Sequence, residues 1–108
     1  MSDNPHLPSL LLDEDMLLTL QELCHYCDMQ AEQILSMVDQ GILEPQHGPA
    51  PERWRFTAVM VHRVQLVKRL QRDLDLNLPG AALAVDLIDE VKHLREQVRA
   101  LEKLLFED

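Results

Sequence analysis

The segment Gln30–Leu43, QAEQILSMVDQGIL, sets the fold class of this chain. Its apolar residues recur at the spacing of a short amphipathic helix that ends at Gly41. The segment before it, LTLQELCHYCDM (Leu18–Met29), indicates another short helix. Two short helices joined by a tight turn predict a helix-turn-helix, whose second helix normally carries positive or polar groups for DNA. Here that helix carries Glu32 and Asp39 and no positive charge.

Local signals place the ends of the first helix and the turn. Thr19 and Glu22 have the spacing of a capping box, in which each side chain binds a free backbone N–H. Leu18 and Leu23 are placed to form the hydrophobic staple of the same helix. Asp28 suits the turn, because Asp tolerates left-handed backbone better than most residues. We therefore expect helices from Thr19 to about Cys27 and from about 30 to 40.

The negative charge is concentrated in the first half of the chain. Residues 1–52 contain ten Asp and Glu and no Lys or Arg, whereas residues 53–108 contain nine acids and ten cations. The net charge of −9 therefore comes almost entirely from the first half. Such a surface repels nucleic acid and anionic lipid and attracts a basic partner. The acids predicted to meet that partner are Glu22, Asp28, Glu32, Asp39 and Glu44, in or beside the first two helices.

Length and composition limit the remaining possibilities. A chain of 108 residues is one domain, with too small a core for a large enzyme pocket. Cys24 and Cys27 are too few and too close for a disulfide framework. The N-terminus lacks the basic flank of a signal peptide, and no apolar run approaches the roughly 20 residues of a membrane span. These features predict a cytoplasmic protein without a cofactor or a catalytic site.

The middle of the chain predicts a wing. The segment EPQHGPAPERWRFT (Glu44–Thr57) holds three prolines and a glycine, which forbid a helix, and its end alternates like a short strand. We expect a strand-loop-strand flap that Trp54 and Phe56 seat on the core. A helix follows from about Thr57 to Asp75, with apolar residues at helical spacing.

The C-terminal part predicts a long coiled-coil helix. Pro79 suits the first turn of a helix that begins at Leu78 or Pro79, with Asn77 as a cap. This helix runs to about Leu105, roughly 40 Å at 1.5 Å per residue. Apolar residues recur along it every four and then three residues, which is a heptad pattern. These residues form the heptad seam, which we expect to join two copies of the chain: Leu87, Val91, Leu94, Val98, Leu101 and Leu105.

The predicted fold is therefore mainly all-α, with three parts. Residues 1–17 form a flexible acidic segment, in which Leu10–Leu12 is a candidate edge strand. Residues 18–78 form a winged helix-turn-helix domain, and residues 79–108 form the coiled-coil dimerisation helix. Valines at 91 and 98 with leucines at 87, 94 and 101 favour a parallel dimer.

This order of elements resembles the MerR-like winged-helix domain. The match begins with Thr19, Glu22 and Leu23 and ends with Gly41–Leu43 before Pro45. The DNA-binding members have an Arg and aromatic residues in the second helix, where this chain has Leu35, Ser36 and Met37. Their later Arg pair is replaced by Asp39 and Gln40. Dimers of that fold, by resemblance, use an antiparallel arm, so the orientation of the seam stays open.

Within that fold the chain closely resembles the chaperone-modulator (CbpM) family. The resemblance is most specific around Leu78-Pro79-Gly80 and the acidic turn that follows, with Asp86, Asp89 and Glu90. The family often has Trp where this chain has Leu78. The resemblance implies a non-enzymatic protein that binds the J-domain of a DnaJ-like co-chaperone (CbpA). A J-domain presents a basic helix to its Hsp70 (DnaK), and an acidic module that covers it would block that contact.

The cysteines and histidines give only weak support for a metal site. Cys24 and Cys27 lie on one helix face with His25 between them, but zinc takes four ligands and no second pair exists. The other histidines, among them His6, His47 and His62, are scattered.

A basic region follows the wing and has two interpretations. It is either a solvated helix face, with ion pairs to Asp73 and Asp75, or a DNA-binding site. It consists of Arg53, Arg55, Arg63, Lys68, Arg69 and Arg72. Three hypotheses therefore stand: a J-domain inhibitor, a dimeric DNA-binding regulator, and an adaptor in which only the coiled coil acts.

Overall fold

The computed structural model describes residues 16–106, and the prediction for Leu10–Leu12 lies outside this range. The elements follow the order of the sequence prediction. Strand β1 (Leu17–Leu18) leads into helices α1 (Leu20–Cys27) and α2 (Ala31–Asp39), and a 3₁₀ turn η3 (Pro51–Arg53) lies in the wing. Strand β2 (Phe56–Thr57), helix α3 (Ala58–Leu74) and helix α4 (Leu78–Phe106) complete the chain. The prediction of a mainly helical protein is confirmed.

The helix ends confirm the local signals in the sequence. The Thr19 hydroxyl accepts from the Glu22 N–H, and the Glu22 carboxylate accepts from the Thr19 N–H, which is the expected capping box. Asp28 ends α1 in the left-handed conformation, with φ 55°. The Asn77 side chain accepts from the Gly80 N–H at 2.8 Å, as a cap at the start of α4 should. These short-range contacts explain why the helices begin and end where the sequence indicates.

The wing differs from the prediction. Residues 44–57 were expected to form a strand-loop-strand flap, but only one bridge, Gln46 to Arg55, joins its two sides. Strand β2 pairs instead with β1, antiparallel, with Leu18 opposite Phe56. The prolines of this loop cannot donate to a ladder, which limits the flap to one bridge. Leu17, assigned from the sequence to the N-terminal segment, therefore belongs to this small sheet.

The core lies where α1, α2 and α3 meet the sheet. Phe56 is fully buried and Trp54 nearly so, with their rings edge to face and 6.1 Å between centroids. The prediction that these two residues seat the wing on the core is thus confirmed. Leu18 and Leu23 lie in the same cluster, as the hydrophobic staple requires. From α3, Val61, Val64 and Val67 fill the centre.

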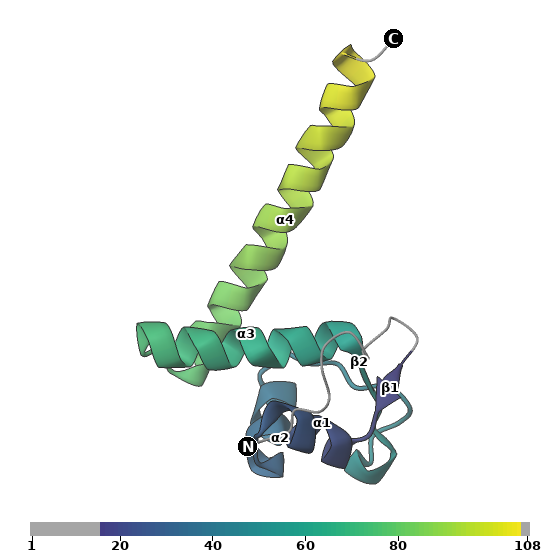
Figure 1. Cartoon of the computed structure of the whole chain (residues 1–108), viewed down its shortest axis with the longest axis vertical. Helices are drawn as coiled ribbons and strands as arrows, with labels where there is room; N and C mark the ends of the chain where they lie inside the picture. The colour runs from purple at the N-terminus through teal and green to yellow at the C-terminus, as the bar shows by residue number, and fades with distance from the viewer. Residues whose placement is uncertain (1–15, 107–108) are drawn as a thin grey trace.

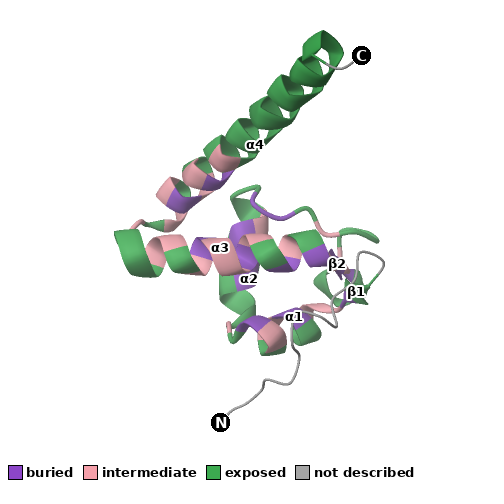
Figure 2. Ribbon diagram, turned by 45° about the horizontal axis from the view of Figure 1, so that its top comes forward, coloured by how far each residue is buried: buried purple, intermediate pink, exposed green. Residues whose placement is uncertain are grey.

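Helix α4 projects from this core as a long arm. Figure 1 shows it leaving the far end of α3 and extending well beyond the other helices. Ala81 and Val85 are fully buried in the core cluster, so the first two turns of α4 belong to the packed body. From Asp89 onward every residue of the arm that the structure describes is exposed, which Figure 2 shows as a continuous green ribbon.

Candidate partner-binding surface

The five acids predicted to contact a partner are all exposed in the structure. We call them the acidic surface: Glu22, Asp28, Glu32, Asp39 and Glu44. They lie on α1, the turn after it, α2 and the loop beyond α2. No cation lies among residues 16–52 of the described chain, so nothing in this part neutralises them locally.

These acids do not have equivalent roles. The Glu22 carboxylate accepts the Thr19 N–H at 2.9 Å and so helps to hold the start of α1. Glu32 and Asp39 are seven residues apart on α2, which places them two turns apart on one helix face. Leu35 and Ser36 lie between them on that face and are exposed. The outward face of the second helix is therefore acidic at both ends and has an aliphatic side chain at its centre.

The three central residues of α2, Leu35, Ser36 and Met37, divide into two groups. Leu35 is 37% exposed and Ser36 is exposed, so a partner can reach both. Met37 is 1% exposed and belongs to the core, so its side chain explains packing rather than recognition. Three residues adjacent in sequence thus face different environments, because one side of α2 packs against α1 and the core cluster.

Two of the six cations of the basic region make contacts inside the protein. Arg63 donates from Nε to the carbonyl of Ile42 at 2.8 Å and pairs with Asp89 of α4. Lys68 donates to the carbonyl of Cys27 at the end of α1. These two cations are only partly exposed, so the expectation of a solvated basic face is wrong for them. They hold the end of α1, the segment after α2 and the α4 arm in place.

The other basic residues lie nearer the surface. Arg72 pairs with the neighbouring Asp73 at 2.8 Å, which confirms that expected ion pair, and Arg72 holds the pKa of the Asp73 carboxyl below its usual value. No such pair is found for Asp75, which instead ends α3 in the left-handed conformation. Arg55 is partly exposed and donates to the Trp54 carbonyl. Arg53 and Arg69 are exposed.

The two cysteines are free thiols in α1. Cys27 is buried, and burial raises its pKa to about 11, so its thiol stays neutral and unreactive at physiological pH. Cys24 is partly exposed, and its partial burial also raises its pKa. Within residues 16–106 no group of three His, Cys, Asp or Glu side chains is placed to hold a metal ion.

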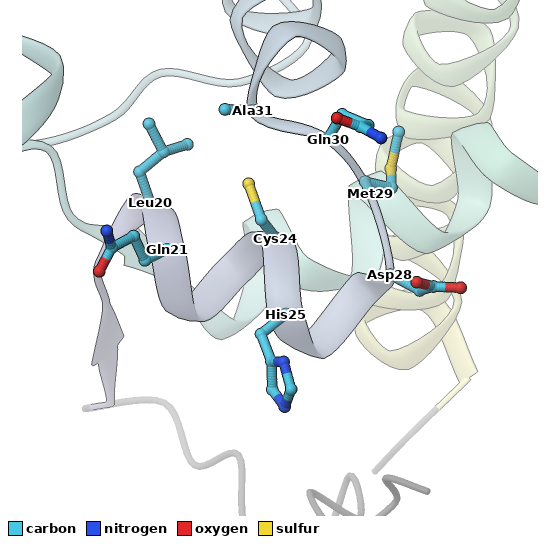
Figure 3. Close-up of a pocket in the computed structure, with 8 residues that line it drawn as sticks. All are labelled: Leu20, Gln21, Cys24, His25, Asp28, Met29, Gln30 and Ala31. Atoms are coloured by element: carbon cyan, nitrogen blue, oxygen red, sulfur yellow. The ribbon is translucent and has the colours of Figure 1, made fainter. Parts of the chain in front are cut away.

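A hollow lies between α1 and the start of α2, as Figure 3 shows. Leu20 and Cys24 point into it from α1, and Ala31 faces them from the first residue of α2. Its volume is about 590 Å³. Sequence periodicity does not reveal such a feature, because it depends on how two helices cross. The only signal in the sequence is that Leu20 and Cys24, on the side of α1 that lines the hollow, are apolar.

The heptad seam is exposed along the arm. The six side chains, Leu87, Val91, Leu94, Val98, Leu101 and Leu105, are 45–73% exposed in the single chain. They lie on one face at coiled-coil spacing, which leaves a long apolar stripe. No helix in the described part of the chain is long and apolar enough to cross a membrane.

Comparison with known proteins shows which family this chain belongs to. The family described as "MerR HTH family regulatory protein" matches residues 18–103. The chaperone modulatory protein CbpM of Coxiella burnetii (strain RSA 331 / Henzerling II) is 33% identical over 94 residues, covering 87% of this chain and 88% of that protein. The protein of the same name from Pseudomonas entomophila (strain L48) is 33% identical over 88 residues, covering 82% and 86%. The chain therefore belongs to the chaperone modulatory protein CbpM family and has its MerR-like winged-helix fold.

Proposed function

We propose that this chain is a non-enzymatic modulator that binds the J-domain of a DnaJ-like co-chaperone of the CbpA type. By covering the basic helix of the J-domain, it keeps an Hsp70 (DnaK) from docking there. The observation that carries the proposal is the acidic surface, five exposed carboxylates on a two-helix unit without a cation. Family membership supplies the class of partner, a chaperone component.

The charge pattern suits a basic protein helix better than DNA. On α2, Glu32 and Asp39 flank Leu35, so a cationic amphipathic helix could place positive groups beside both acids and an apolar side chain over the leucine. Complementary charges speed the encounter and fix orientation. The same carboxylates would repel duplex DNA, because its phosphates are also negative. Affinity for DNA depends mainly on contacts between cations and these phosphates. The engagement of Arg63 and Lys68 inside the protein removes two cations from a rival DNA site.

The heptad seam adds a second part to the proposal. We infer that two chains pair through it, which presents two acidic surfaces from one dimer. Free thiols at Cys24 and Cys27 suit action in the reducing cytoplasm.

Charge reversal tests the proposal directly. Association of a J-domain with the variant carrying Glu32→Lys and Asp39→Lys is followed by stopped-flow or surface plasmon resonance at low and high salt. The control carries Glu96→Lys and Glu102→Lys, which are exposed acids on the α4 arm and change the net charge equally. We expect slower association and a weaker salt dependence only in the first variant, since exposed rim charges act mainly on the association rate.

Two further measurements complete the test. Circular dichroism should show the same helix content in both variants, because all four positions are exposed. In a steady-state ATPase assay, the wild-type chain should suppress J-domain stimulation of the Hsp70, and the first variant should suppress it less. If the first variant associates as fast as wild type at low salt, α2 is not the docking face. The region Pro79–Glu90 would then be the next candidate.

A further inference from the structure

We propose that the hollow between α1 and α2 holds an apolar side chain of the partner's basic helix and anchors it there. This inference rests on the proposed function and names the recognition element within it. The occupant is a cationic amphipathic helix that presents one aliphatic or aromatic side chain between its Lys or Arg residues.

The lining of the hollow has the character of an anchor site. The side chains of Leu20, Cys24 and Met29 are partly buried and pack against the core cluster, so they form an apolar floor. In Figure 3, Leu20 and Cys24 point toward Ala31 across the hollow, while His25 points away from it. Gln21, Asp28 and Gln30 supply polar groups around this floor.

The floor is held in place before any partner arrives. The Met29 N–H donates to the Cys24 carbonyl at 3.0 Å, which fixes the turn after α1. The Gln33 side chain accepts from the Gln30 N–H at 2.9 Å, which fixes the start of α2. Lys68 holds the end of α1 from the other side. A preformed site loses little conformational freedom on binding, which favours affinity.

Charge distinguishes this hollow from others of similar size. Two hollows near the wing, of about 540 and 520 Å³, are both lined by Arg55, and the second also by Arg53. A smaller one near Ile42 is lined by Arg63. Each of these linings also contains one acid, Glu52 or Glu44, so its positive charge is at best offset and no lining is purely acidic. The α1–α2 hollow has no Lys or Arg in its lining and carries Asp28, with Glu32 next to Ala31 in the sequence.

An anchor is also what the acidic surface lacks. Exposed ion pairs contribute little to equilibrium affinity, because water and salt screen them. Binding energy in protein interfaces is concentrated where a side chain fills a desolvated pocket. We therefore assign different roles to the two features: the carboxylates set the association rate, and the hollow sets the dissociation rate.

The test fills the hollow without changing charge. Ala31→Leu adds bulk at an exposed first position of α2, where leucine suits a helix. Ala100→Leu is the matched control, the same substitution at an exposed position on the arm, outside the heptad seam. Titration calorimetry of the full chain with a J-domain should show at least tenfold weaker binding for Ala31→Leu and wild-type binding for Ala100→Leu. The salt dependence of Ala31→Leu should match wild type.

A second readout uses the cysteines already present. Iodoacetamide modification at pH 9, quantified by mass spectrometry, should label Cys24 in the folded chain while buried Cys27 stays unlabelled. A saturating J-domain should slow Cys24 labelling at least fivefold. If the J-domain binds wild type and Ala31→Leu equally and leaves Cys24 reactive, the hollow is not the anchor, although the proposed function stands. If the J-domain does not bind wild type at all, both proposals fail.

Discussion

Removing apolar side chains from the heptad seam should separate the proposed dimer. The six seam residues are 45–73% exposed, so about half of each side chain is still open to solvent and would be covered on pairing. Full burial of an aliphatic side chain contributes about 1.5–3 kcal/mol, so each contributes about 1 kcal/mol on pairing and the twelve in a dimer about 12 kcal/mol.

The variant with Leu94→Asp and Leu101→Asp removes four of these twelve contributions. The loss of about 4 kcal/mol raises the dissociation constant about 1,000-fold, since each 1.4 kcal/mol is a factor of ten. Carboxylates placed in an apolar seam weaken it further. Sedimentation velocity at micromolar concentration should therefore show monomers.

The matched control carries His93→Asp and Ala100→Asp. These positions have the same seven-residue separation, lie one residue before each seam leucine and are exposed, but they fall outside the seam. The control should sediment like wild type. An unchanged dimer in the seam variant, or equal dissociation of both variants, would refute the assignment of the seam. Circular dichroism must show comparable helix content in all three proteins.

Four further outcomes are expected. Fluorescence anisotropy should detect no duplex DNA binding at physiological salt, and micromolar binding with a salt slope of several units would instead favour a DNA-binding regulator. In urea unfolding, Arg63→Met should lower the free energy of unfolding by about 1.5–3 kcal/mol, because a charged hydrogen bond to a carbonyl is lost, whereas the surface change Arg72→Met should stay within about 0.5 kcal/mol. Thr19→Ala should cost about 1 kcal/mol through the lost helix cap, with Thr19→Gly milder, and equal losses would argue against capping. Because burial raises the pKa of Cys27 to about 11, stability should be complete below pH 9 and fall toward pH 11 as the unfolded thiol ionises first, and Cys27→Ala should reduce that fall.

Local signals in the sequence determined the helices of this protein. The capping box at Thr19 and Glu22, the left-handed turn at Asp28 and the Asn77 cap each depend on residues within three positions of one another. Such contacts form wherever the chain folds, so they can be predicted without knowing the packing. Amphipathic spacing likewise indicated part of the buried side of α3, Val64 and Val67, although Leu74 at the same spacing is exposed.

Long-range packing decided the rest. Strand β2 pairs with β1 rather than within the wing, because β1 supplies free N–H and C=O groups that the proline-rich loop cannot. Arg63 looked like a surface cation, yet it joins Ile42 and Asp89, which lie 21 and 26 residues away. The hollow beside Ala31 exists only because α1 and α2 cross there. The sequence by itself determined the helices, their caps and the charge of the first half, since these follow from neighbouring residues. The partner of each strand, the contacts of Arg63 and Lys68 and the shape of the candidate anchor required the tertiary structure, since they depend on residues that only folding brings together.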